Sequence, residues 1–177
     1  YIKASINREY FHYETAQYAL GSQASNILAL HFDIVPQEYR QRVLNNLTAD
    51  IAAHDYHLTT GNIATKYLFE VLSDNGLVDV AYAIATQEDY PSWGYMFANG
   101  ATTIWERWEL GTTCEMNSHN HPMYGTISTW FFKHLAGISP LEPGFKKLRI
   151  APKLPQKLDH AEGRLETVLG DVVSKWE

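Results

Sequence analysis

The sequence predicts a mainly α-helical fold that ends in a short strand-rich segment. Up to Gly137, apolar residues recur at three- and four-residue spacings between short loops, a pattern typical of buried or amphipathic helices. After Pro140 the pattern changes to alternating, β-branched residues punctuated by Gly and Pro, which is typical of strands. The boundary falls near residues 138–146, and we divide the chain into segments 1–140 and 141–177.

The first predicted helix runs from Glu14 to His31, because its apolar residues have the mixed three- and four-residue spacings of a largely buried helix. Asp33 to Pro36 interrupts this pattern. Pro36 suits the first turn of a second helix, which runs to about Ala53. The second helix carries one apolar stripe, formed by Val43, Leu47 and Ile51.

A third and a fourth helix follow a short loop. Either Thr59 or Thr60 could cap the third helix with its hydroxyl group, and the pair Asn75 and Gly76 is a credible end for it. The fourth helix covers residues 77–86. Short connections between successive helices predict antiparallel neighbours.

Two further helices are expected at residues 101–110 and 125–136. Beyond them, KKLRIAPKL (146–154) and GRLETVLGDVVSKW (163–176) are predicted strands. Helices with short loops followed by strands suggest layers of α-hairpins with a small β-sandwich packed behind them. This order of elements is a clue to the fold and does not specify chemistry.

Composition excludes several classes of protein. Hydrophobic residues make up 45% of the chain and charged residues 19%, close to globular averages and unlike disordered chains. The net charge is −6 and the basic residues are scattered, which argues against nucleic-acid binding. No apolar run approaches the roughly 20 residues of a membrane helix. Cys114 is the single cysteine, which excludes an internal disulfide and a multi-cysteine metal site.

The segment from Pro91 to Glu109, PSWGYMFANGATTIWERWE, combines three Trp, one Tyr and two carboxylates. Gly94 and Gly100 allow the backbone to bend at both ends of YMFAN, so this loop could bring Trp93 to the same cleft as the helix expected after it. Apolar faces beside a carboxylate suit the recognition of a pyranose ring. They equally suit an ordinary aromatic core.

If residues 102–110 are helical, Trp105 and Trp108 share one face, and Glu106 and Glu109 share an adjacent one. A carboxylate flanked by two indoles could be a catalytic base in a sugar cleft. Alternatively, both Trp residues belong to the core and Glu106 pairs with a neighbouring basic residue. The residues alone leave both readings open.

A second polar segment, MNSHNHPMYG (116–125), contains His119 and His121. Two His residues separated by one position and without a nearby third ligand make a poor zinc site, so we predict no metal. A polar loop that holds Asn120 and His121 over a hydroxyl-rich ligand is one interpretation, and hydrogen-bonded structural histidines are the other.

Three segments resemble the bacterial α-L-rhamnosidases of glycoside hydrolase family 78: HLTTGNIATKYLFEVL, PSWGYMFANGATTIWERW and NHPMYGTISTWFFKHLAGI. GATTIWERW and the NH segment after it are the specific ones, and the resemblance extends from about Glu14 to Trp176. It implies that residues 1–140 are the second half of an (α/α)6 catalytic barrel and that residues 141–177 are part of a C-terminal β-sandwich.

The resemblance also implies an activity, the inverting hydrolysis of terminal α-L-rhamnosyl bonds in an oligosaccharide, polysaccharide or glycoside, without a cofactor. The Glu of the WExW motif, here Glu106, corresponds to the general base. The His of the NH motif, here His121, corresponds to a rhamnose contact, with Asn120 beside it. Trp93 and Trp108 are carried over as walls of the cleft.

The resemblance places the general acid on an acidic segment in the earlier half of the barrel, and this sequence has no equivalent. The expected partner is therefore the remaining N-terminal part of the same enzyme, and residues 1–177 alone are expected to be inactive. The NH motif departs from the family pattern at Pro122 and Met123, which affects the placement of His121.

Two other functions remain as alternatives: another helical-barrel carbohydrate enzyme, such as a different exo-glycosidase or a polysaccharide lyase, and a sugar-binding remnant without catalysis. The sequence does not fix the compartment, and we favour a periplasmic or extracellular location over a cytoplasmic one.

Overall fold

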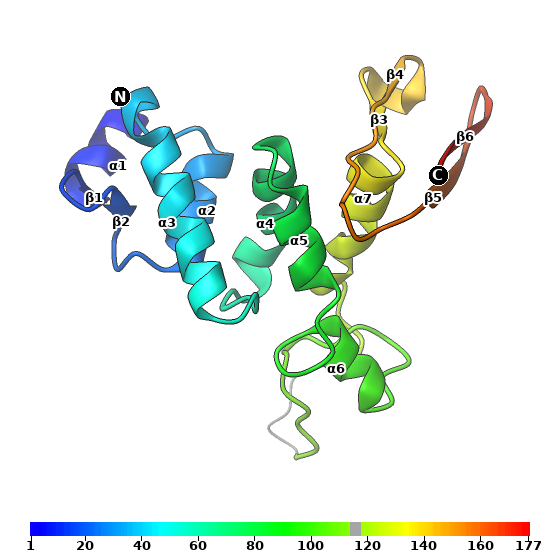
Figure 1. Ribbon diagram of the computed structural model, residues 1–177, viewed down its shortest axis with the longest axis horizontal. Helices are drawn as coiled ribbons and strands as arrows, with labels where there is room; N and C mark the ends of the chain where they lie inside the picture. The colour runs from blue at the N-terminus through cyan, green and yellow to red at the C-terminus, as the bar shows by residue number, and fades with distance from the viewer. Residues whose placement is uncertain (114–117) are drawn as a thin grey trace.

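The computed structural model describes residues 1–113 and 118–177. Within these ranges the chain is mainly helical, with short antiparallel strand pairs toward both ends of an elongated array (Figure 1). The mainly helical prediction is therefore confirmed. Cys114 and the start of the polar segment at Met116 lie outside the described residues. None of the described helices has the length and apolarity that crossing a membrane requires.

The N-terminal region differs from the prediction. Helix α1 (Ile2–Tyr10) leads into a two-stranded pair, β1 (Phe11–His12) and β2 (Gln17–Tyr18), and helix α2 (Gln23–His31) follows. The expected helix from Glu14 is wrong in its first half.

The backbone explains why this helix begins late. Ala16 and Ala19 have φ values of 55° and 49°, which a right-handed helix does not allow. The Ser22 hydroxyl accepts the Ser25 N–H at 3.2 Å and caps the start of α2.

The central helices confirm the prediction to within a few residues. They are α3 (Arg40–Ala53), α4 (Asn62–Asp74) and α5 (Val78–Ala85). Helix α2 packs against α3 and α4, and α4 packs against α5. Their buried aliphatic side chains form one core, which includes Val43, Leu47, Ile51, Leu68 and Leu72.

The predicted threonine cap of α4 is wrong. Gly61 occupies the N-cap position, and the helix has no side-chain cap. The Thr60 hydroxyl is instead buried and lies 2.7 Å from the Thr65 hydroxyl. Thr60 therefore contributes a buried polar contact behind the helix start.

Helix α6 (Trp93–Ala98) ends at a turn in which Gly100 has a φ of +79°, and the helix expected over residues 101–110 is absent. Residues 104–106 pair their backbone with residues 118–121. The run Thr102, Thr103, Ile104 is β-branched, which disfavours a helix here. Trp105 and Trp108 therefore do not share a helix face.

The last predicted helix is present in a composite form. A 3₁₀ turn at Met123–Thr126 leads into α7 (Ile127–Trp130), and a π-helical turn at Phe131–Leu135 completes it. Trp130 and Leu135 are buried, whereas Phe131 is 45% exposed.

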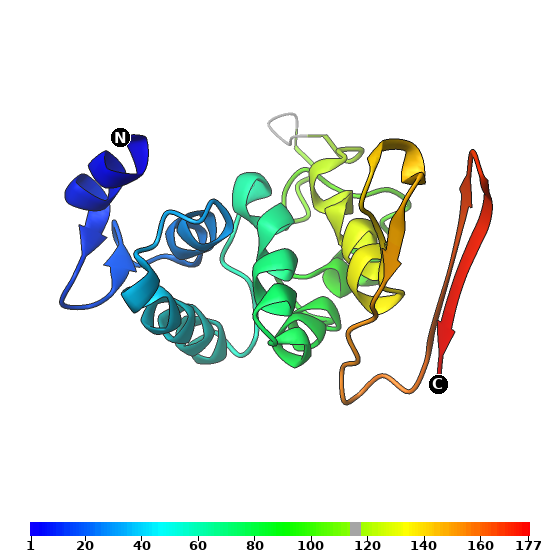
Figure 2. The ribbon, with the colours of Figure 1, turned by 90° about the horizontal axis from the view of Figure 1, so that it is seen from above.

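Both strand-rich segments form antiparallel pairs. Strand β3 (Ile138–Pro140) pairs with β4 (Leu148–Ile150), and β5 (Ala161–Thr167) pairs with β6 (Gly170–Trp176). Figure 2 shows the β5–β6 hairpin at one end of the molecule, beyond α7. The Trp176 indole N–H donates to the Leu135 carbonyl at 2.8 Å and ties the hairpin to the helical region.

Candidate active site

The candidate site is built where the segment after α6 meets the segment before α7. The Glu106 N–H donates to the Ser118 carbonyl at 2.9 Å, and the His121 N–H donates to the Ile104 carbonyl at 2.8 Å. These two bonds bring Glu106 and His121, fifteen positions apart in the sequence, into one small structural unit. Both side chains are half-buried.

The Glu106 carboxylate is held by the main chain. Its Oε2 atom accepts the Ser118 N–H at 2.9 Å. Within the described ranges, no Lys, Arg or His side chain forms an ion pair with Glu106, so the expected alternative of a structural ion pair is not seen. An amide N–H orients a carboxylate without placing a positive charge beside it.

His121 is oriented by the start of the next helical turn. The Met123 N–H points to His121 Nδ1 over 3.3 Å, so Nδ1 acts as the acceptor. A neutral imidazole in this arrangement carries its hydrogen on Nε2. His121 therefore presents a donor to a ligand. The neighbouring Asn120 is exposed, and its backbone N–H donates to the Ser118 hydroxyl at 3.0 Å.

His119, the other histidine of this segment, has a packing role. Its ring stacks on Trp105 with centroids 5.2 Å apart, and its Nε2 lies 3.1 Å from the Gly111 carbonyl. Trp105 itself is 3% exposed. Among the described residues, no three His, Cys, Asp or Glu side chains converge as a metal site would require.

An aromatic cluster forms around Trp108, two positions after Glu106 in the sequence. Trp108 stacks on Tyr124 with centroids 3.9 Å apart, and Trp93 and Trp108 form a T-shaped pair with centroids 4.9 Å apart. The Trp93 indole donates to the Tyr124 carbonyl at 3.1 Å, and the Trp108 indole donates to the Thr60 carbonyl at 2.9 Å. Each buried polar atom of the two indoles is thus satisfied, which fixes both rings.

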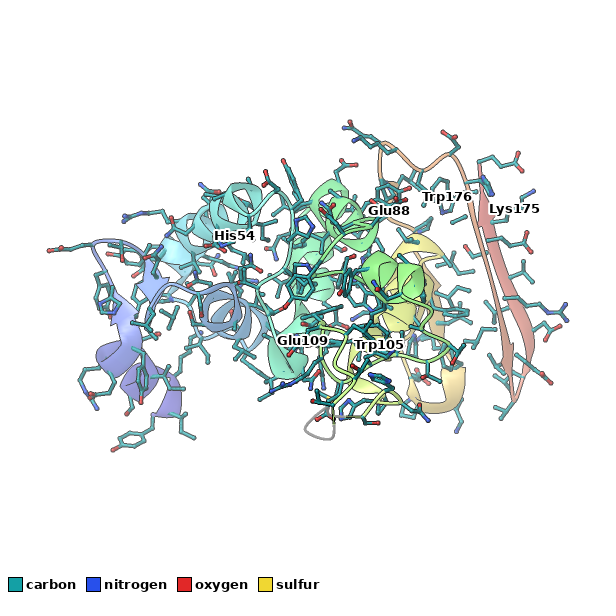
Figure 3. The ribbon with its side chains drawn as sticks, turned by 90° about the horizontal axis from the view of Figure 1, so that it is seen from below. His54, Glu88, Trp105, Glu109, Lys175 and Trp176 are labelled. Atoms are coloured by element: carbon teal, nitrogen blue, oxygen red, sulfur yellow. The ribbon has the colours of Figure 1, made fainter. Side chains whose placement is uncertain are left out.

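A cavity of about 310 Å³ opens on this cluster, and its lining includes neither Glu106 nor His121. Trp108 and Tyr124 contribute to its wall, while Arg107 and Glu109 form an ion pair at 3.3 Å on its edge. Burial raises the pKa of Tyr124 to about 12, with a smaller contribution from the negative charge of Glu109. Trp93 is 4% exposed and does not line the cavity. Figure 3 shows Glu109 and Trp105 in this loop region, far from Lys175 and Trp176 on β6.

Sequence reasoning missed Ser118, the Met123 amide and Tyr124. The contacts of Ser118 and Met123 involve the main chain, which leaves no signature in a side-chain pattern. The aromatic residue of NHPMYG was the available signal for Tyr124.

Comparison with known protein families gives two matches that together cover nearly the whole chain. The sequence model of the bacterial alpha-L-rhamnosidase 6 hairpin glycosidase domain matches residues 1–135, and that of the bacterial alpha-L-rhamnosidase C-terminal domain matches residues 137–177. An alpha-L-rhamnosidase of Alteromonas sp. (strain LOR) is 42% identical over 161 residues, which cover 88% of this chain and 18% of that protein.

Solved structures agree. The alpha-L-rhamnosidase of Dictyoglumus thermophilum matches with a TM-score of 0.94 and 43% identity, over 99% of this chain and 20% of that one. The Streptomyces avermitilis alpha-L-rhamnosidase, solved in complex with L-rhamnose, matches with a TM-score of 0.93 and 34% identity, over 99% of this chain and 18% of that one. This chain thus spans about a fifth of the length of these relatives, and it belongs to the bacterial α-L-rhamnosidase family.

Proposed function

We propose that the enzyme to which this chain contributes hydrolyses terminal α-L-rhamnosyl bonds with inversion, and that Glu106 is its general base. One observation carries the proposal. The Glu106 carboxylate is half-buried, bound by an amide N–H and free of a described cationic partner, and the same short unit holds His121. A base that must take a proton from water needs access to that water and a fixed orientation.

In this mechanism Glu106 removes a proton from a water molecule while the water oxygen attacks the anomeric carbon. The glycosidic bond breaks as a carboxylic acid elsewhere in the enzyme protonates the leaving oxygen, so the protons balance. His121 donates from Nε2 to a hydroxyl of the rhamnose, and Asn120 contacts the sugar from the same loop. Trp108 forms part of the cleft wall, with Trp93 supporting it from behind. No step calls for a cofactor.

The same proposal concerns architecture. Residues 1–140 form the second half of an (α/α)6 barrel, and residues 141–177 form part of a β-sandwich. The match to a six-hairpin glycosidase domain and the packing of α2 against α3 and α4 support the barrel. The general acid then lies in the N-terminal part of the enzyme, so residues 1–177 alone should not hydrolyse a rhamnoside.

The test is the substitution Glu106→Gln in the complete enzyme. The amide keeps the size of the side chain and can keep a hydrogen bond, but it cannot take a proton. We expect kcat for a nitrophenyl α-L-rhamnoside to fall by roughly 10²–10⁴-fold while rhamnose binding persists. Glu142→Gln is the matched control because Glu142 is a glutamate of the C-terminal segment that does not line the cavity and is paired with Lys147. It should stay near wild-type turnover. Near wild-type turnover of E106Q would leave a sugar-binding role only.

A further inference from the structure

We propose that Ser118 is a positioning residue of the active site: its backbone N–H aims the Glu106 carboxylate, and its hydroxyl maintains a bulge that places His121 beside that carboxylate. The inference rests on the proposed function. Ser118 is exposed, so its contribution to a buried core is small, yet three described hydrogen bonds of the site involve its amide or hydroxyl.

The bulge follows from the hydrogen-bond register. The bond from the Glu106 N–H to the Ser118 carbonyl sets these two residues opposite each other in an antiparallel arrangement. Regular pairing would then set Asn120 opposite Ile104. Instead, the His121 N–H donates to the Ile104 carbonyl, so the second segment contains one extra residue.

The extra residue decides which side chain reaches the site. Ile104 and Glu106 are two positions apart and point to the same side of an extended segment. With the bulge, His121 rather than Asn120 is the residue opposite Ile104, which places His121 on the side of Glu106. Trp105 points the other way, and its stacking on His119 agrees with this assignment.

The Ser118 hydroxyl satisfies the backbone that the bulge leaves unpaired. Its Oγ accepts the Asn120 N–H at 3.0 Å and also lies 3.0 Å from the Asn120 carbonyl, to which it can donate. Without this hydroxyl, the Asn120 N–H and carbonyl would lack partners in the bulge. The backbone could then adopt other conformations that satisfy them. The hydroxyl therefore favours the register that sets His121 opposite Ile104.

The Ser118 amide has the complementary role. In regular pairing it would donate to the Glu106 carbonyl, but here it donates to Oε2 of the side chain at 2.9 Å. This bond fixes one carboxylate oxygen and leaves Oε1 as the atom that takes the proton. The amide and the hydroxyl of Ser118 thus orient Glu106 and His121 relative to each other.

The test is Ser118→Ala in the complete enzyme, which removes the hydroxyl and keeps the amide. Because the change acts through a sugar contact, we expect KM to rise about tenfold, the value of one hydrogen bond, with a smaller change in kcat. Ser118→Thr keeps a hydroxyl and should restore KM. If Ala impairs folding, Ser118→Thr and Ser118→Val carry the test, since they match in shape and differ in the hydroxyl.

Thr167→Ala is the matched control. The Thr167 hydroxyl makes the same kind of contact on the distant β5–β6 hairpin, where it accepts the Leu169 N–H at 3.1 Å and donates to the Gly170 carbonyl at 2.7 Å. This variant should have wild-type KM and kcat.

A double-mutant cycle with His121→Ala identifies the route of the effect. If Ser118 acts through His121, S118A should cause no further rise in KM when His121 is already absent. Wild-type kinetics of S118A, or additive losses in the double mutant, would overturn the inference. If E106Q loses turnover and S118A keeps wild-type kinetics, only the role of Ser118 is refuted. An active E106Q would refute the proposed function.

Discussion

At the scale of single residues, His134 shows how burial and charge compete. Its side chain is 3% exposed and its Nε2 lies 3.2 Å from the Asp74 carboxylate, while its Nδ1 has no hydrogen-bond partner among the described residues. Burial lowers the pKa of His134 and outweighs the opposite effect of Asp74. Burial dominates because Asp74 is 61% exposed, so water screens its charge.

This lowered pKa predicts a pH-dependent stability. At pH values between the lowered pKa of His134 in the folded chain and its ordinary pKa of about 6.5, the unfolded chain binds more protons than the folded chain. The stabilisation by neutral His134 is therefore complete above the ordinary value and is lost as pH falls through it. Thermal unfolding between about pH 8 and pH 5 should show a falling Tm. His134→Gln should flatten that slope, and Asp74→Asn should steepen it by removing the charge that favours protonation. An unchanged slope in both variants would contradict this assignment.

At the scale of elements, local patterns were sufficient where an apolar stripe determines the packing. The stripe of Val43, Leu47 and Ile51 gave α3, and Gly76 gave the end of α4, whose C-cap is Asn75. The pattern was insufficient over residues 101–110. There the spacing of the tryptophans fits a helix, but Ile104 and Glu106 form backbone hydrogen bonds to residues 118–121 instead, and such long-range pairing has no local signature.

The same limit applies to the site. Glu106 and His121 could be proposed because the WExW and NH motifs resemble those of a known family. Ser118 could not, since its proposed role depends on its amide and on a bulge that only the register reveals. Trp93 was expected on the cleft wall, and its burial behind Trp108 depends on how the indoles pack.

The junction after α7 provides a prediction at the element scale. Gly137 has a φ of +75°, and a Cβ atom there would lie 2.2 Å from the Pro152 nitrogen. Gly137→Ala should lower the free energy of unfolding by about 2–4 kcal/mol, from left-handed strain and steric overlap together. Gly144 is the matched control because its φ is +70° with nothing within 4 Å of an added Cβ. Gly144→Ala should cost about 1–2 kcal/mol. Equal losses of unfolding free energy in the two variants, measured by denaturant titration, would refute the close approach of Gly137 to Pro152.

At the scale of the whole molecule, this chain supplies the proposed base and the proposed sugar contact, and the proposed acid belongs to the rest of the enzyme. Large apolar side chains such as Leu20, Ile63 and Val168 are 99%, 70% and 86% exposed in this chain. These side chains lie in separate parts of the chain, so their exposure does not define one contact face.

The central claim is that Glu106 activates a water molecule and does not attack the sugar itself. Room for that water requires the carboxyl groups of base and acid to be roughly 6.5–9.5 Å apart, whereas a nucleophile would lie nearer, at about 5–5.5 Å. The two arrangements give opposite stereochemistry in the first product. The direct measurement is proton NMR of the complete enzyme with an α-L-rhamnoside, recorded before the released sugar mutarotates. We predict that β-L-rhamnose appears first, and the appearance of α-L-rhamnose first would contradict Glu106 as the base of a single displacement.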